Sequence, residues 1–139
     1  MSKCCVIGMG YIGLPTAAIL ANVGHNVIGV DIDEKKVNQI NQGQTYIQEP
    51  DLNQLIYNVV SRGKLVAKLT PSKSDVFIIA VPTPFFEANS NIPEPNLEYV
   101  YAAVRSIVKV LEEGNLIIIE STSPVGTTKK IAKLIKDLT

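Results

Sequence analysis

Three glycines near the amino terminus are spaced as Gly-x-Gly-x-x-Gly and could bind a diphosphate through bare backbone. Gly8 permits a tight turn, Gly10 lets the backbone come close to a pyrophosphate, and Gly13 lets the following helix lie against the strand. The start of that helix, at Tyr11 and Ile12, directs free N–H groups and a partial positive charge at the phosphates. Because an apolar run precedes the glycines and a helical pattern follows them, the sequence predicts a dinucleotide site here.

A single carboxylate, Asp31, supplies the second half of this pattern. It follows the apolar run at 26–30 and lies roughly 20 residues beyond Gly10, as expected for such a site. Its oxygens can accept hydrogen bonds from the adenosine ribose hydroxyls and would repel a 2′-phosphate, so NAD is the expected cofactor. The alternative is that Asp31 caps the next helix, although Asp33 is the better candidate for that cap. Lys36, one turn into the helix, either reaches back toward the adenosine or is a solvated surface lysine.

Two threonines, Thr83 and Thr122, follow later apolar runs at the tips of expected strands. Hydroxyl groups there can bond a ribose, a carboxamide or a water near a nicotinamide, or else cap the next element. No cysteine–histidine cluster has the spacing of a metal site, and no carboxylate pair is spaced for acid–base chemistry. His25 follows a helix end, where a surface turn is the expected role. The residues therefore predict a cofactor site and no metal site, and His25 as a catalytic base is the less favoured alternative to the surface turn.

These residues need a scaffold that brings them together, and the hydropathy pattern predicts one. Six apolar runs alternate with helical segments, which implies parallel βαβ units with right-handed crossovers in a Rossmann-like, doubly wound, three-layer α/β/α fold. The expected strands are 3–8, 26–31, 65–69, 76–81 and 116–119. The expected helices are 11–23, 33–41, 51–60, 97–113 and 127–137. In such a sheet the ligand lies beyond the carboxyl ends of the strands, where the glycine turn, Asp31 and the corners at 82–84 and 120–122 should meet.

Three local features lead to further expectations. The apolar runs at 76–81 and 116–119 are nearly continuous, which indicates strands covered by helices on both faces. Asp51, with Gln54 three residues later, resembles a capping box. The stretch 85–96 is the one sizeable irregular loop, and loops of this length are often functional.

The composition bounds the class of protein. The chain has 139 residues, enough for one domain with a real core, and its hydrophobic content of 46% is typical of a globular protein. Thirteen basic and thirteen acidic residues balance, so neither nucleic acid nor an anionic membrane is the expected partner. No apolar run has transmembrane length, and no signal peptide precedes the first strand. The adjacent Cys4 and Cys5 point to opposite sheet faces and are expected to be buried thiols of a cytoplasmic protein.

Five motifs in order extend the pattern along the whole chain. They are Gly8-Met9-Gly10-Tyr11-Ile12-Gly13-Leu14-Pro15-Thr16-Ala17, Gly29-Val30-Asp31-Ile32-Asp33, Glu49-Pro50-Asp51-Leu52, Val81-Pro82-Thr83-Pro84 and Glu120-Ser121-Thr122-Ser123-Pro124-Val125-Gly126. Together they resemble the UDP-glucose/UDP-mannuronate dehydrogenase family. The third and fifth motifs look closest to its UDP-N-acetyl-D-mannosamine dehydrogenase branch, and the UDP-glucose and UDP-N-acetylglucosamine 6-dehydrogenases are the competing branches.

The resemblance implies a cytoplasmic oxidoreductase that oxidises the C6 alcohol of a nucleotide sugar to a carboxylate. It implies two steps with two NAD, a role in polysaccharide biosynthesis, and a homo-oligomeric full-length enzyme. The residues that it implies as NAD contacts are Tyr11, Ile12, Asp31, Lys36, Thr83 and Thr122. Thr122 could also orient a water near the sugar C6.

The catalytic half of that family is expected outside this chain. The family's nucleophilic cysteine, its lysine and asparagine and its UDP-sugar pocket lie downstream of the matching region, and Cys4 and Cys5 match nothing catalytic. Residues 1–139 are therefore expected to be the amino-terminal NAD-binding domain, which binds NAD without turning over sugar. Two other classes compete with this interpretation. One is a freestanding NAD-binding or redox-sensing module, and the other is an S-adenosylmethionine methyltransferase, whose glycine loop usually lacks the third glycine.

Overall fold

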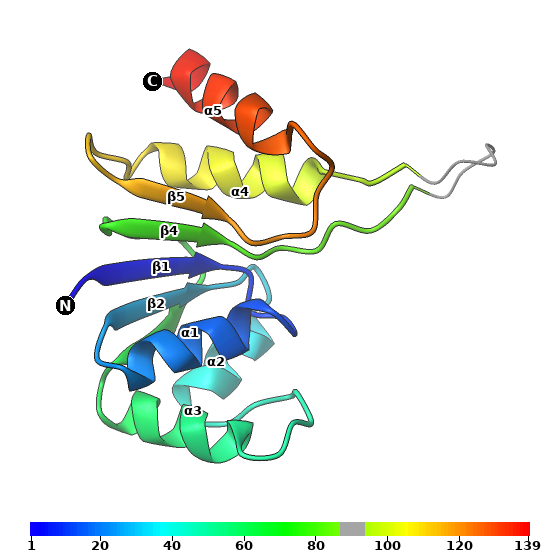
Figure 1. The fold of residues 1–139 in the computed structure, drawn as a ribbon. Helices are drawn as coiled ribbons and strands as arrows, with labels where there is room; N and C mark the ends of the chain where they lie inside the picture. The colour runs from blue at the N-terminus through cyan, green and yellow to red at the C-terminus, as the bar shows by residue number, and fades with distance from the viewer. Residues whose placement is uncertain (87–93) are drawn as a thin grey trace.

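Five parallel strands form the sheet of the computed structural model, which describes residues 1–86 and 94–139 (Figure 1). The strands are β1 (Lys3–Ile7), β2 (Asn26–Val30), β3 (Leu65–Lys68), β4 (Val76–Ile79) and β5 (Leu116–Ile119). Each lies within a predicted range, and the order β3-β2-β1-β4-β5 confirms the doubly wound Rossmann-like sheet. The count of six apolar runs was wrong for the sheet, because only five runs of the described chain pair as strands.

Helices cover this sheet in two layers, which confirms the α/β/α architecture (Figure 1). On one face lie α1 (Gly13–Asn22), α2 (Glu34–Asn41) and α3 (Leu52–Ser61), and on the other lie α4 (Glu98–Val108) and α5 (Thr127–Leu138). Each face has its own buried core. Alternate residues of β1 divide between them, with Cys4 and Val6 in the first core and Cys5 and Ile7 in the second.

The two cysteines are buried free thiols on opposite faces of β1, as predicted. Burial raises the pKa of Cys5 to about 11, so its thiol stays protonated at neutral pH. Burial also raises the pKa of Cys4, and the nearby Asp75 carboxylate adds to this effect. Both residues therefore serve packing rather than nucleophilic chemistry.

The starts of two helices test the predicted caps. Asp33 caps α2 as expected, because its Oδ1 accepts a hydrogen bond from the Lys35 N–H at 3.0 Å. The capping box predicted at Asp51 and Gln54 is wrong. Asp51 has a left-handed backbone with φ of 67° and its side chain makes no capping bond, whereas the Gln54 amide donates to Asn58 Oδ1. A left-handed backbone turn at Asp51, rather than a side-chain cap, therefore leads into α3.

Strand β5 is covered on one face only, so the prediction that both of its faces are buried was wrong. Leu116 and Ile118 are 54% and 40% exposed, whereas Ile117 and Ile119 pack in the core that α4 and α5 cover. The difference arises because α1 packs over β1, β2 and β3 and leaves the same face of β5 open in the described chain. By contrast, residues 77–79 of β4 are buried, as predicted.

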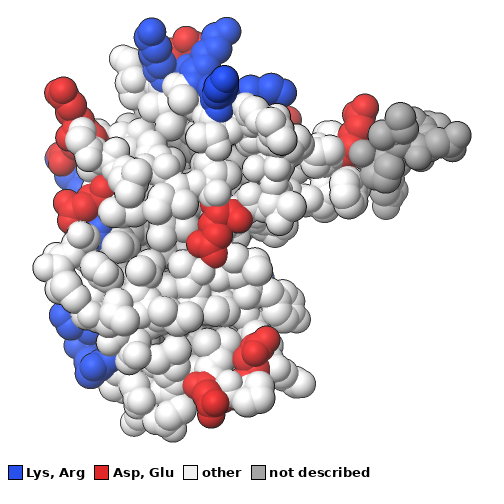
Figure 2. Space-filling model, viewed as in Figure 1, with Lys and Arg blue, Asp and Glu red and all other residues white. Residues whose placement is uncertain are grey.

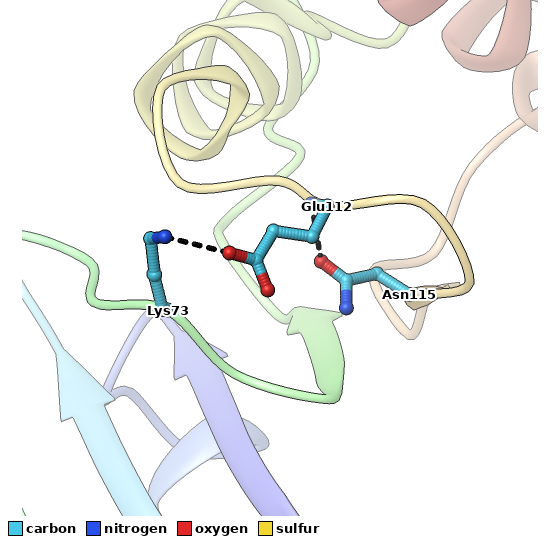
Figure 3. Close-up of polar contacts among 3 residues, drawn as sticks. All are labelled: Lys73, Glu112 and Asn115. Carbon is cyan, nitrogen blue, oxygen red and sulfur yellow. Dashed lines mark hydrogen bonds and ion pairs between the residues drawn. The ribbon is translucent and has the colours of Figure 1, made fainter.

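The amino-terminal edge of the sheet carries an exposed ion pair between the segments that enter β4 and β5 (Figure 3). The Lys73 Nζ lies 2.6 Å from Glu112 Oε1, and this hydrogen bond raises the pKa of Lys73. Asn115 Oδ1 accepts a hydrogen bond from the Glu112 N–H at 2.8 Å, which shapes the turn before β5. Exposed pairs of this kind contribute little to stability. The pair also lies at the opposite end of the sheet from the predicted site.

Charge is distributed unevenly over the surface despite the balanced total. Basic side chains gather over α5 (Figure 2). They are Lys129, Lys130, Lys133 and Lys136. None of the helices that the structure describes combines the length and the apolar character needed to cross a bilayer.

The irregular loop predicted at 85–96 is described only at its two ends, since residues 87–93 lie outside the described residues. Phe85 forms an antiparallel bridge with Pro95. The Phe86 N–H donates to the Glu94 carbonyl at 2.8 Å. The two ends of the loop therefore lie side by side as they leave β4 and approach α4.

Candidate functional site

The glycine turn lies at the carboxyl end of β1, between β2 and β4. Gly8 has φ of +100°, and its N–H donates to the Val30 carbonyl at 2.7 Å, which ties the turn to β2. A Cβ at Gly8 would lie 2.7 Å from the Ala80 carbonyl oxygen, and a Cβ at Gly13 would lie 1.7 Å from the Gly8 carbonyl oxygen. Backbone therefore packs directly on backbone at Gly8 and Gly13, which a side chain would prevent.

Gly10 differs from these two glycines because a side chain there would enter open space. No heavy atom of the described residues lies within 4 Å of a Cβ built at Gly10. The adjacent start of α1 is also open, since the N-cap residue Ile12 makes no side-chain capping bond and Tyr11 is 78% exposed. The first N–H groups of α1 and their partial positive charge thus border a space that a phosphate can enter.

Asp31 joins the tips of β1 and β2. Its Oδ2 accepts a hydrogen bond from the Met9 N–H at 3.0 Å, and its Oδ1 accepts one from the Asp33 N–H at 2.9 Å. The alternative role of Asp31 as a helix cap is wrong, because Asp33 occupies that position. A carboxylate has about four lone-pair sites, so both oxygens keep the capacity to accept further hydroxyl groups.

A cavity of about 450 Å³ opens beside Asp31, on the face of the sheet that carries α4. Its walls are the tips of β1 and β2, the chain just beyond β4, one side of α4, and residues 69–71 of the crossover from β3 to β4. This crossover is fully described and contains no helix, which leaves room above β2. The apolar lining includes Ile32, Leu69, Pro71, Val81 and Tyr99. The size and the apolar walls suit a flat heteroaromatic group such as adenine.

Lys36 also lines this cavity, from the first turn of α2. Its Nζ lies 5.2 Å from the centroid of the Tyr46 ring, within the range of a cation–π interaction. The Tyr46 hydroxyl in turn donates to the carbonyl of Met9 in the glycine turn. The half-buried Lys36 thus faces the site and is not the freely solvated lysine of the alternative interpretation.

The two predicted threonines lie just beyond β4 and β5, outside the lining of this cavity. Thr83 is half-buried and Thr122 is exposed. Neither is the N-cap of the helix that follows, since those positions in α4 and α5 belong to Leu97 and Gly126. Helix capping therefore does not explain them, and their hydroxyls remain candidates for a part of the cofactor that extends beyond the cavity.

Two polar contacts that the sequence did not reveal hold the same strand tips. The Ser121 hydroxyl donates to the Val81 carbonyl at 2.8 Å, which joins the end of β5 to the end of β4. Glu120 Oε1 accepts a hydrogen bond from the Thr16 hydroxyl at 2.6 Å, which joins β5 to α1. Only the strand order brings these partners together, because they lie far apart in the sequence.

The residues of α4 that line the cavity were not predicted as part of the site, although their spacing in the sequence indicates one side of a helix. The residues that face the cavity are Tyr99, Ala102, Ala103 and Ser106. They recur at i, i+3, i+4 and i+7, the spacing of one helix side. Small side chains at the last three of these positions leave room for a ligand.

The described groups suit the parts of NAD in chemistry and in size. The space over Gly10 and the uncapped start of α1 can receive the diphosphate, and Asp31 offers acceptors for ribose hydroxyls. The apolar cavity beside Asp31 can receive the adenine. All of these features lie at the carboxyl edge of the sheet, next to the point where the strand order reverses between β1 and β4.

Known proteins are similar to this chain in sequence and in fold. The family model described as the UDP-glucose/GDP-mannose dehydrogenase family, NAD binding domain, matches residues 2–139. The chain is similar to the UDP-N-acetyl-D-mannosamine dehydrogenase of Campylobacter jejuni, at 55% identity over 132 residues that cover 95% of this chain and 32% of that protein. It is also similar to the NDP-N-acetyl-D-galactosaminuronic acid dehydrogenase of Ralstonia nicotianae, at 50% identity over 127 residues that cover 91% of this chain and 29% of that protein.

A solved structure is similar to this chain in fold as well as in sequence. The UDP-N-acetyl-mannosamine dehydrogenase Cap5O from Staphylococcus aureus superposes with a TM-score of 0.92 at 41% identity, and the match covers 99% of this chain and 33% of that chain. The chain thus spans about a third of the length of the curated relatives that it matches.

Proposed function

The chain belongs to the UDP-glucose/GDP-mannose dehydrogenase family as its NAD-binding domain, and we propose that the complete protein is a UDP-N-acetyl-D-mannosamine dehydrogenase. In this proposal it oxidises the C6 alcohol of UDP-N-acetylmannosamine to the carboxylate of UDP-N-acetylmannosaminuronate, with two NAD per sugar. NAD, when bound, supplies the hydride acceptor. The residues of this chain bind and orient that cofactor, and the catalytic cysteine and the UDP-sugar pocket are assigned to the downstream part of the complete protein.

The open space over Gly10 carries this proposal, because it is where backbone and a diphosphate can meet without a side chain between them. We place the diphosphate there, against the N–H groups of Tyr11 and Ile12, and the adenosine ribose against Asp31. The adenine then enters the cavity that Lys36 borders. The hydroxyls of Thr83 and Thr122 are assigned to the nicotinamide end, where Thr122 can also orient a water near the sugar C6.

The choice of sugar follows from the 55% identity with the Campylobacter jejuni enzyme and from the two motifs at 49–52 and 120–124. Because the sugar contacts are assigned outside residues 1–139, the complete protein is the right material for the test. Its kcat/KM with UDP-N-acetylmannosamine is expected to exceed the values with UDP-glucose and with UDP-N-acetylglucosamine. A higher kcat/KM with either of the other sugars would make that sugar the substrate, and the proposed oxidation at C6 would stand.

We assign the open face of β5 to contact with the further domains of the complete protein. Leu116 and Ile118 expose apolar side chains side by side on this face, and contiguous apolar surface is typical of protein contacts. The short span of this chain relative to its relatives supports the existence of those domains. The complete enzyme is proposed to be a homo-oligomer.

We further propose a cytoplasmic enzyme of polysaccharide biosynthesis. The buried, unpaired thiols of Cys4 and Cys5 are compatible with a reducing compartment. A nucleotide-activated uronate, the product of the proposed reaction, is the kind of donor that a glycosyltransferase consumes.

Titration of the 139-residue chain tests the cofactor half of this proposal. NAD is expected to bind measurably in calorimetry, and NADP at least about tenfold more weakly, because the 2′-phosphate would lie beside the Asp31 carboxylate. S-adenosylmethionine and UDP-sugars are expected to show no binding. The chain alone is expected to form no NADH from NAD and UDP-N-acetylmannosamine, and steady NADH production would contradict the assignment of the catalytic groups to downstream chain.

Asp31→Ala is expected to weaken NAD binding by about 1–3 kcal/mol, because the ribose hydroxyls lose their acceptor and the Met9 N–H loses its partner. Asp75→Ala is the matched control, since Asp75 Oδ2 also accepts a backbone hydrogen bond, from the Lys3 N–H at 2.8 Å, but at the opposite end of the sheet. Calorimetry should show a weaker NAD complex for the first variant alone. Equal NAD affinities for the two variants would remove Asp31 from the site.

A further inference from the structure

Tyr46 contacts the glycine turn from a loop that the dinucleotide pattern does not include. The loop joins α2 to α3, and contacts of the two residues next to the tyrosine fix its position in the loop. Thr45 Oγ1 accepts a hydrogen bond from the Ile47 N–H at 3.0 Å, and the Ile47 side chain is buried in the first core. These contacts present the Tyr46 hydroxyl to the Met9 carbonyl oxygen, to which it donates a hydrogen bond.

Met9, the residue between the first two glycines, is fixed through its N–H, its carbonyl and its side chain. Its N–H donates to Asp31 Oδ2 at 3.0 Å, and its carbonyl accepts from Tyr46. Its side chain is fully buried and lies over Gly29 of β2, where a Cβ would come within 2.5 Å of the Met9 sulfur. The turn is thus anchored at Met9 by Gly29 within β2, by Asp31 at the tip of β2 and by Tyr46 in the α2–α3 loop.

The direction of the Met9 carbonyl also determines the direction of the Gly10 N–H. The two groups belong to one planar peptide unit, and in a trans peptide they point in opposite directions; the described chain contains no cis peptide. Without such a contact this peptide plane could rotate, because the rotation changes ψ of Met9 and φ of Gly10, and glycine has wide φ freedom. A donor that binds the carbonyl therefore turns the Gly10 N–H toward the other side, away from the tyrosine.

The surroundings of Tyr46 keep its hydroxyl a donor. Burial raises the pKa of Tyr46, and the Asp31 and Asp33 carboxylates raise it further, so the hydroxyl remains protonated at physiological pH. The ammonium of Lys36, 5.2 Å from the ring centroid, holds the ring from the cavity side.

We propose that Tyr46 is a positioning residue for the cofactor diphosphate: its hydrogen bond to the Met9 carbonyl locks the Met9–Gly10 peptide plane so that the Gly10 N–H faces the phosphates. This role rests on the proposed NAD site. It acts through the turn alone, so the adenosine contacts at Asp31 and in the cavity do not depend on it.

The test compares Tyr46→Phe with Tyr57→Phe in the 139-residue chain. Tyr46→Phe keeps the ring under Lys36 and removes only the hydroxyl, and Tyr57 is an exposed tyrosine on α3 that supplies the matched control. Affinities are measured for NAD and ADP, which carry the diphosphate, and for adenosine, which lacks it. Tyr46→Phe is expected to weaken NAD and ADP by about five- to tenfold, the usual effect of one lost hydrogen bond, and to leave adenosine binding within about twofold. Tyr57→Phe is expected to change none of the three affinities.

The ¹⁵N–¹H resonance of Gly10 in the ligand-free chain supplies a second measurement. It is expected to shift or broaden in Tyr46→Phe and to stay unchanged in Tyr57→Phe, because only the first variant frees the peptide plane. Unchanged NAD and ADP affinities in Tyr46→Phe would overturn the inference and leave the NAD site intact. An equal loss for NAD, ADP and adenosine would also overturn it, since that is the effect of a general structural role. No NAD binding by the unmodified chain would instead refute the proposed function itself, and the inference with it.

Discussion

Gly13→Ala is expected to destabilise the domain by about 3 kcal/mol or more and to abolish measurable NAD binding. A methyl group at this position would lie 1.7 Å from the Gly8 carbonyl oxygen, and that atom belongs to backbone that cannot turn aside. Overpacking of a core usually costs about 1–3 kcal/mol, and a backbone collision this close belongs at or beyond the upper end of that range. Helix propensity acts in the opposite direction, because alanine is favoured over glycine by about 1 kcal/mol inside a helix.

The loss of binding follows from the way the clash must be relieved. The start of α1 would have to move away from the end of β1, and the N–H groups of Tyr11 and Ile12 would move with it. Urea unfolding measures the stability and calorimetry measures the affinity. Unchanged stability in Gly13→Ala would show that α1 does not pack on the Gly8 backbone as closely as the structure indicates.

Gly10→Ala is expected to have the second largest effect, and on binding alone. The added methyl would meet no heavy atom of the described residues within 4 Å, and Gly10 is not among the glycines with positive φ. The free energy of unfolding should therefore change by no more than about 0.5 kcal/mol, as for a surface substitution. The methyl would, however, occupy the space assigned to the diphosphate, and NAD affinity should fall by about 2 kcal/mol, or roughly 30-fold.

Each of these two variants is the control for the other. They add the same methyl group three residues apart. We expect Gly13→Ala to destabilise the fold and Gly10→Ala to block the ligand. An NAD affinity in Gly10→Ala equal to that of the unmodified chain would mean that the phosphates do not pass over Gly10. The diphosphate placement, including the role inferred for Tyr46, would then be incorrect.

Much of this architecture could be predicted because its signals are local. The apolar runs at 3–8 and 26–31 became β1 and β2, and the glycine turn directly follows the first of them. Asp33 caps α2 because a short acidic side chain reaches the N–H groups next to it in the chain. Where a local signal misled, as at Asp51, a left-handed backbone replaced the expected side-chain cap.

Other features depended on which elements the sheet brings together. The open face of β5 could not be predicted, because a continuous apolar run does not show whether a helix lies above each face. The cavity exists because α4 and the helix-free crossover at 69–75 border the same tip of β2 from different parts of the chain. A spacing pattern gives the face of a helix, but it does not give the neighbour that this face meets.

Local features predicted the kind of protein: the alternation of apolar runs and helices, the three glycines and Asp31 indicate a Rossmann-like domain with a dinucleotide site. These are properties of residues close together in the chain, where sterics and hydrogen bonding act directly. The folded chain adds two contacts that no pattern predicted: Tyr46 donates to the Met9 carbonyl from 37 residues away, and Thr16 donates to Glu120 across the strand tips. Such contacts have no local signature, because they form only after the strand order has brought distant segments to one edge of the sheet.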